Sequence, residues 1–258
     1  MDLKISDQRF IICGASSGFG EAIARQLLVE GANVVLVARR GEILRDKFGH
    51  FHDQVEIIEG SVLYSETLDK IEKSANKSPF HGVLLNAGGP PTGTPLKTDM
   101  KDWDAAWQLV MRWKIDLSLR LAPLLVDHGY GRILFIESQS VKQPLPSLTL
   151  SNSFRAGVVG FAKSLALEIA KHKVTVNVLA PGSHETPAID RVIKNNSSIR
   201  GVSYDQAKKE MEENIPVRRM GTAEELASLA SWLLSPHSGY ITGQTLSHDG
   251  GVISGLFG

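Results

Sequence analysis

The chain has 258 residues, of which 42% are hydrophobic, so it can bury a core large enough for one α/β domain. Lys plus Arg and Asp plus Glu both total 28, and this balance argues against nucleic acid or a membrane surface as a partner. The single cysteine excludes an internal disulfide and favours a reducing, cytoplasmic location. No signal-peptide core opens the sequence, and no apolar run is long enough to span a membrane.

A glycine-rich turn lies near the start of the chain. An apolar run at residues 10–13 predicts a strand buried on both faces, and it is followed by Gly14, Gly18 and Gly20 before an amphipathic helix begins. The spacing is G-x3-G-x-G, unlike the G-x-G-x-x-G of long-chain dehydrogenases. A tight strand-to-helix turn needs glycines even without a ligand. A second apolar strand at 34–37 favours dinucleotide binding, with phosphate at the helix start.

Strand and helix signals alternate along the rest of the chain. Further strands are expected at 55–58, 82–85, 132–136 and 174–179, and helices at 68–75, 102–126 and 151–172. This alternation predicts a single-domain α/β fold, a doubly wound parallel sheet with right-handed crossovers. Ligands bind such sheets at the carboxyl ends of the strands, where the chain places residues 14–20, residues 86–91, Ser138 and the Pro181-Gly182 turn.

Six sequence pieces occur in a fixed order. They are CGASSGFG at 13–20, LNAG at 85–88, Ser138, NVLAPG at 177–182, PVRRMGTAEELA at 216–227 and GYITGQTLSHDGG at 239–251. With these pieces the chain resembles a short-chain dehydrogenase/reductase from about residue 8 to residue 251, in the 3-oxoacyl-acyl-carrier-protein reductase-like branch. The resemblance implies a Rossmann fold and a nicotinamide cofactor. It does not settle the substrate.

The resemblance also implies which residues bind the cofactor. Those around the pyrophosphate and the adenosine ribose would be Gly14, Ser16, Ser17, Gly18 and Phe19, and those along the adenine and ribose would be Ser61, Val62, Asn86, Ala87 and Gly88. Pro181 and Gly182 would pass the nicotinamide, with Thr186 near its carboxamide or the pyrophosphate. Ser61 departs from the family, which usually has Asp there. The 86–88 and 181–182 turns could also be ordinary ends of strands.

The end of the second strand bears on the choice of cofactor. A site selective for NAD places a carboxylate there, whereas a 2′-phosphate needs a cation with forked donors. The chain has Arg39 and Arg40 and no acidic residue before Glu42. We therefore expect NADP(H), with these arginines on the 2′-phosphate. The alternative is a pair of solvated arginines at the start of a helix.

The catalytic positions depart further from the family, whose motif is Ser, twelve residues, Tyr, three residues and Lys, with Asn on the preceding long helix. Ser138 is present, but Ser151 stands at the Tyr position, Arg155 at the Lys position and Val110 at the Asn position. A serine hydroxyl is much less acidic than a phenol held near an ammonium group. Arg155 can hold ribose hydroxyls and add positive charge, but it does not release a proton at ordinary pH.

A proton donor must then come from elsewhere if the protein is an enzyme. His184 follows the Pro181-Gly182 turn and titrates in the useful range, so it is the candidate donor. Lys142 and Glu137 flank Ser138. Each of these could instead be a solvent-facing loop residue.

The segment 183–215 shows little periodicity before residues 204–214 and resembles the substrate lid of the family, with Pro187, Ile189, Val192 and Ile193 as an apolar lining. Three functions stay open. The first is an NADP(H)-dependent oxidoreductase with a non-standard proton donor, acting on a carbonyl or a conjugated C=C bond. The second is a catalytically silent cofactor-binding protein, and the third is a non-redox lyase or isomerase. The resemblance implies a homodimer or homotetramer built on the two long helices.

Overall fold

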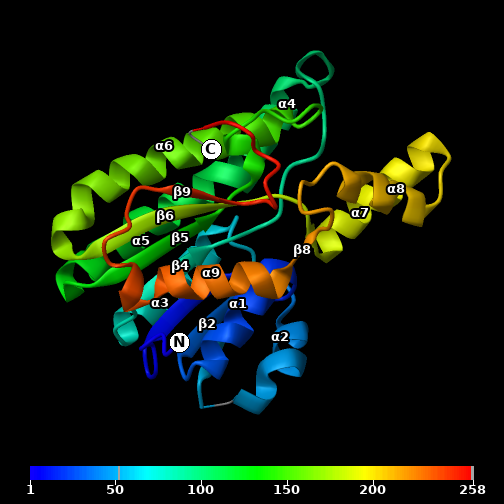
Figure 1. The fold of residues 1–258 in the computed structure, drawn as a ribbon. Helices are drawn as coiled ribbons and strands as arrows, with labels where there is room; N and C mark the ends of the chain where they lie inside the picture. Colours follow the sequence, from blue (N-terminus) through cyan, green and yellow to red (C-terminus); the bar gives the residue numbers. More distant parts are fainter. Residues whose placement is uncertain (52, 257–258) are drawn as a thin grey trace.

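The computed structural model describes residues 1–51 and 53–256, and a seven-stranded parallel sheet lies at the centre of these residues (Figure 1). The strand order is β3-β2-β1-β4-β5-β6-β9. The strands are β1 (Arg9–Cys13), β2 (Asn33–Ala38), β3 (Val55–Glu59), β4 (Gly82–Leu85), β5 (Gly131–Ile136), β6 (Val174–Pro181) and β9 (Thr245–His248). The predicted doubly wound parallel fold is therefore confirmed.

The strand order reverses between β1 and β4. From β1 the chain moves outward through β2 to β3, then returns to place β4 on the other side of β1 and continues through β5 to β6. Ile11 of β1 is paired with Val35 of β2 on one side and with Val83 of β4 on the other, and all three are fully buried. Ligands in open α/β sheets bind outside the carboxyl ends of strands at such a reversal.

Helices cover both faces of the sheet. The long helices are α1 (Gly18–Val29), α2 (Gly41–Phe48), α3 (Ser65–Lys77), α5 (Trp113–His128), α6 (Thr149–Ile169) and α9 (Ala223–Leu234). Figure 1 shows α1 and α9 together on one face and α5 and α6 on the other. The apolar residues form a separate core on each face, one with α1 and α9 and one with α3, α5 and α6. Short 3₁₀ turns lie at Gly49–Phe51, Pro95–Lys97, Gln139–Val141, Ala170–His172 and Pro236–Ser238.

The helix expected at 102–126 is not uniform. It begins as α4 (Met100–Ala106), passes through a π-helical segment at Trp107–Arg112, and continues as α5. The π segment carries Val110, which is 1% exposed, at the position where the family has Asn. π-Bulges occur frequently at functional sites, because they shift the side chains that follow them.

The segment predicted as a lid contains more regular structure than its sequence pattern suggested. After β7 (His184–Glu185), which pairs with β8 (Gly221–Thr222), come α7 (Pro187–Arg200) and α8 (Tyr204–Glu213). The helix α7 was not expected. Figure 1 shows α7 and α8 projecting beyond the sheet. They have a small core of their own, built from Ile193, Ala207, Ile215 and Met220. Over the described ranges, no helix has both the length and the apolar character needed to cross a bilayer.

Candidate active site

The turn after β1 leaves no room for a side chain at Gly14 or Gly20. Gly14 has φ +71°, and a Cβ atom there would lie 2.6 Å from the carbonyl oxygen of Asn86. A Cβ at Gly20 would lie 2.3 Å from the carbonyl oxygen of Gly14. Both distances are far below van der Waals contact, so the close approach of β1, α1 and the loop after β4 requires glycine. The 14–20 and 86–88 stretches, predicted to bind one cofactor, therefore lie against each other.

The start of α1 provides open donors. Ser17 is the N-cap residue, and its side chain makes no capping hydrogen bond. A phosphate group could therefore be held by the first backbone N–H groups of the helix and by its positive dipole end. Thr186 lies beside this start, with its Cγ2 atom 3.6 Å from the position of a Cβ on Gly18. Phe19, one residue further on, packs edge-on against His184 with ring centroids 5.1 Å apart.

The cations predicted for a 2′-phosphate lie next to the same turn. Arg39 and Arg40 are exposed at the end of β2, and Nη2 of Arg40 donates a hydrogen bond to Oγ of Ser16 over 3.3 Å. Lys47 of α2 was not predicted, yet its Nζ donates to the backbone oxygen of Ser16 over 3.3 Å and to Glu21 over 2.6 Å. The sequence signal for it is its position on the amphipathic helix that begins directly after Arg40.

Taken together, this cradle fits a phosphorylated dinucleotide: glycines admit the backbone close to a pyrophosphate, helix N–H groups can bind it, and cations flank the ribose side. Ser61 and Val62 are half-buried just beyond β3, and Oγ of Ser61 accepts a hydrogen bond from the backbone N–H of Leu63 over 3.4 Å. The individual ligand roles of these residues stay predictions.

Three of the predicted catalytic residues gather at the carboxyl ends of β4 and β5. Ser138 directly follows Glu137 at the end of β5, and its Oγ accepts a hydrogen bond from the backbone N–H of Ser140 over 3.2 Å. Ser151 and Arg155 both lie on α6, one turn apart, and Nε of Arg155 donates to Oγ of Ser151 over 2.9 Å. Each serine oxygen therefore accepts a hydrogen bond and keeps its own proton for another partner.

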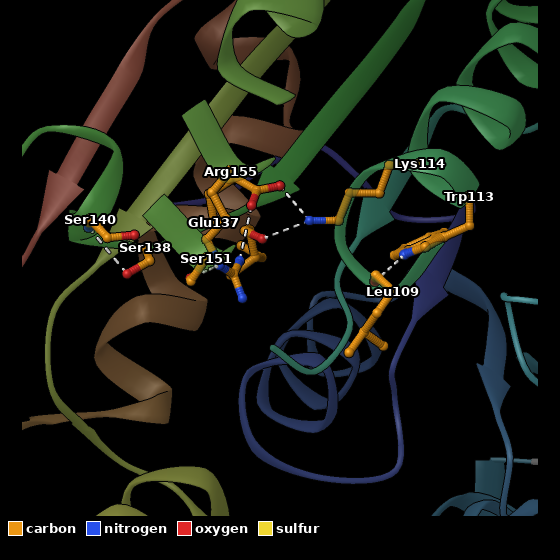
Figure 2. Close-up of polar contacts among 9 residues, drawn as sticks. Leu109, Trp113, Lys114, Glu137, Ser138, Ser140, Ser151 and Arg155 are labelled. Atoms are coloured by element: carbon orange, nitrogen blue, oxygen red, sulfur yellow. Dashed lines mark hydrogen bonds and ion pairs between the residues drawn. The ribbon is translucent and has the colours of Figure 1, made fainter. Parts of the chain in front are cut away.

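A buried cluster of charges lies beneath these hydroxyl groups (Figure 2). The side chain of Glu137 is 0% exposed and lies between two cations. Nη1 of Arg155 donates to Oε2 of Glu137 over 2.9 Å, and Nζ of Lys114 donates to Oε1 of Glu137 and to the carbonyl oxygen of Ile136. Burial lowers the pKa of the Lys114 ammonium group. The neighbouring Glu137 carboxylate acts in the opposite direction and raises this pKa. Glu137 and Lys114 are therefore structural parts of the site, not solvent-facing residues.

Sequence reasoning missed Lys114. It lies four residues after Val110, just past the π-helical segment, as the second residue of α5. A lysine on a helix is ordinarily exposed. Only the packing of α5 against the end of β5 reveals that this one is buried.

His184 lies apart from the serine and arginine cluster. Its Nδ1 is 3.1 Å from the carbonyl oxygen of Gly182, and its Nε2 is 2.8 Å from Nδ1 of His248. It is 3% exposed, and burial lowers its pKa. The cavity that it lines, of about 320 Å³, includes none of the three residues Ser138, Ser151 and Arg155. The structure therefore does not bring the predicted donor into contact with the other predicted catalytic groups.

The segment predicted as a lid lines a second, open cavity of about 230 Å³. Thr186, Pro187, Ile189 and Ile193 line it, so three of the four apolar residues predicted for a substrate lining are present. Val192, the fourth, is 43% exposed and does not line it. The role of the segment as a lid stays a prediction.

Comparison with known proteins defines the class. A family model described as enoyl-(acyl carrier protein) reductase matches residues 14–253. With the doubly wound sheet and the glycine turn, this match shows that the chain belongs to the short-chain dehydrogenase/reductase family.

Individual relatives cover almost the whole chain. Nodulation protein G of Rhizobium sp. (strain N33) is 31% identical over 252 residues, which are 96% of this chain and 98% of that protein. The NADPH-dependent reductase BacG of Bacillus subtilis (strain 168) is 28% identical over 263 residues, covering 98% of this chain and all of BacG (100%). A crystal structure of L-sorbose reductase from Gluconobacter frateurii with NADPH and L-sorbose has a TM-score of 0.93 and 29% identity, and covers 99% of this chain and 100% of that one.

Proposed function

We propose that the protein is an NADP(H)-dependent oxidoreductase that reduces a carbonyl or conjugated enoyl substrate without a tyrosine acid. The observation that carries this proposal is the cradle formed by the glycine turn, the uncapped start of α1 and the cations around Ser16. Relatives whose names or structures include NADPH support the choice of cofactor.

The bound cofactor would supply a hydride. Gly14, Gly18 and the N–H groups of α1 would hold its pyrophosphate, and Arg39, Arg40 and Lys47 would bind the phosphate on its adenosine ribose. The loop that contains Pro181 and Gly182 would pass its reactive ring, and Thr186 would contact it from the start of α7.

The hydroxyl groups of Ser138 and Ser151 and the guanidinium group of Arg155 would receive the substrate oxygen. All three are hydrogen-bond donors, and none of them gives up a proton readily at neutral pH. They can therefore orient a substrate and stabilise negative charge on its oxygen. The proton itself would come from water or from a group outside this cluster.

The same chemistry favours a second candidate. Because Arg155 is already paired with Glu137, and the hydroxyl groups of Ser138 and Ser151 are poor acids, a catalytically silent protein that binds NADP(H) is the alternative function. The two candidates differ in turnover. NADPH consumption across a panel of 3-oxoacyl, quinone and enoyl substrates supports the oxidoreductase, and uniform inactivity of a protein that binds NADPH supports the silent alternative.

We further propose a homodimer or homotetramer in the cytoplasm, with α5 and α6 at a subunit interface. Leu119 of α5 and Leu167 of α6 are 60% and 77% exposed in the single chain, so both leave apolar surface for a partner copy. A monomeric mass by light scattering at micromolar concentration would contradict this assembly.

A further inference from the structure

We propose that Arg155 is a catalytic residue that binds the oxygen of an enolate, so that the site reduces the C=C bond of an α,β-unsaturated carbonyl compound and not an isolated ketone. This inference rests on the proposed function and selects one of its two substrate classes. It begins from the way in which the guanidinium group is held.

Two of the three nitrogens of Arg155 are committed to protein partners. Nε donates to Ser151 and Nη1 donates to Glu137, each over 2.9 Å. The remaining nitrogen, Nη2, donates to no residue in the part of the chain that the structure describes. It lies 3.2 Å from the position of a Cβ on Gly89, beside the loop after β4. In Figure 2 a guanidinium nitrogen points away from Glu137. This nitrogen is fixed in place and is free to donate at the ligand-binding edge of the sheet.

The charge of the cluster also favours an anion. The guanidinium group of Arg155 keeps its charge and shares the single Glu137 carboxylate with Lys114, and all three side chains are at least nine-tenths buried. A buried charge without a counterion is costly. An anionic oxygen at Nη2 would give the buried guanidinium group a second anionic partner, and the pairing with Glu137 holds the guanidinium in the orientation needed for it.

The available donors suit an enolate better than an alkoxide. Reduction of an isolated ketone forms a strongly basic alkoxide, which needs a proton at the oxygen as the hydride arrives. Neither the serine hydroxyls nor the guanidinium group is an effective acid at neutral pH. In conjugate reduction, the hydride bonds to the β-carbon with its own electron pair. The π electrons of the C=C bond then shift to form the enolate, which carries its charge on oxygen. Water then protonates the α-carbon, and NADPH leaves as NADP⁺, so no acid is needed at the oxygen.

A substrate with both bonds tests this directly. With 2-cyclohexen-1-one and NADPH, we expect cyclohexanone as the product. Formation of 2-cyclohexen-1-ol would overturn the inference, and so would the absence of both products with a protein that binds NADPH. Failure to bind NADPH would instead defeat the proposed function itself. Removal of the donor in Arg155→Gln should lower kcat/KM for the enone by about 10²–10³-fold, and Arg155→Lys should restore part of the loss.

A binding measurement makes the test independent of turnover. The probe is 4-nitrophenol, a phenol whose ionised form, the phenolate, absorbs visible light. It is added to the protein with NADP⁺ below the pKa of the free probe. We expect binding to raise the phenolate band. Arg155→Gln should abolish this rise. The variant should still fold, because Glu137 stays paired with Lys114, and its thermal unfolding curve checks this. Lys171→Gln, an exposed cation just after α6, is the matched control and should keep it. An unchanged band in Arg155→Gln, or binding as the neutral phenol, would contradict the inference.

Discussion

Arg155 donates from Nη1 to Oε2 of Glu137 over 2.9 Å, at the point where the family motif has a lysine. The pair joins α6 to the end of β5 inside the protein. The difference from the family motif therefore replaces the lysine amine by a guanidinium group. That group is bound to the carboxylate of Glu137, one residue before Ser138. The consequence is a site whose guanidinium and serine hydroxyl groups are held in place to donate hydrogen bonds but are poor acids at neutral pH.

Glu137→Gln should destabilise the protein strongly. The change leaves Lys114 and Arg155 as two buried cations without a carboxylate, so we expect the free energy of unfolding to fall by about 3–5 kcal/mol. Urea denaturation measures this. Glu210→Gln, which breaks a surface ion pair with Arg200, should leave stability nearly unchanged. An equal effect in both variants would contradict a special role for the buried cluster.

Gly14→Ala should abolish tight NADPH binding. The new Cβ would meet the carbonyl oxygen of Asn86 at 2.6 Å, and φ of +71° strains any residue with a side chain. The loop must shift, and we expect at least a tenfold loss of affinity with a loss of stability of about 1–3 kcal/mol. The control is Gly160→Ala on α6, where no atom lies within 4 Å of the new Cβ. Fluorescence titration with NADPH should find its affinity unchanged.

The double variant Arg39→Ser/Arg40→Ser should weaken binding of 2′,5′-ADP. Each charged hydrogen bond to a phosphate contributes about 1.5–3 kcal/mol, so the loss should be tenfold or more. Calorimetry with 5′-ADP, which lacks the 2′-phosphate, provides the control and should give similar affinity before and after the change. Equal losses for both nucleotides would mean that the arginines do not select the phosphate.

Stability should fall in mild acid partly because of His184. Burial lowers its pKa in the folded protein, so the unfolded chain binds the proton more readily. The contribution of His184 to the free energy of unfolding is full above its pKa of about 6.5 in the unfolded chain. It is lost as the pH falls through and below that value. His81, whose pKa burial also lowers, adds to the same trend. We therefore expect His184→Gln to reduce the slope of unfolding free energy between about pH 7 and pH 5. An unchanged slope would contradict the assignment.

Much of the fold could be predicted because parallel strands buried on both faces are continuous apolar runs. The strand at 82–85 has the predicted bounds. The helix α7 could not be predicted in the same way, because Ile193 is its only buried residue among those described and gives no apolar stripe. The π segment leaves no mark in an apolar pattern that suits an α-helix equally well.

The site was partly predictable for a different reason. The glycine turn could be predicted because a tight strand-to-helix connection needs glycine, whereas its close approach to Asn86 appears only in the structure. The direction in which a side chain points could not be predicted from the sequence. His184 follows the Pro181-Gly182 turn in the chain, yet its ring faces His248, and Lys114 reaches Glu137 only through tertiary packing. A single sequence contains neither relationship.

The most direct test of the central claim is a fluorescence titration of the purified wild-type chain with NADPH, alongside a thermal unfolding curve at each concentration. The glycine cradle and its cations predict saturable binding in the micromolar range and a midpoint of unfolding that rises with NADPH. No change in fluorescence and no shift in the midpoint at high micromolar NADPH would contradict the account.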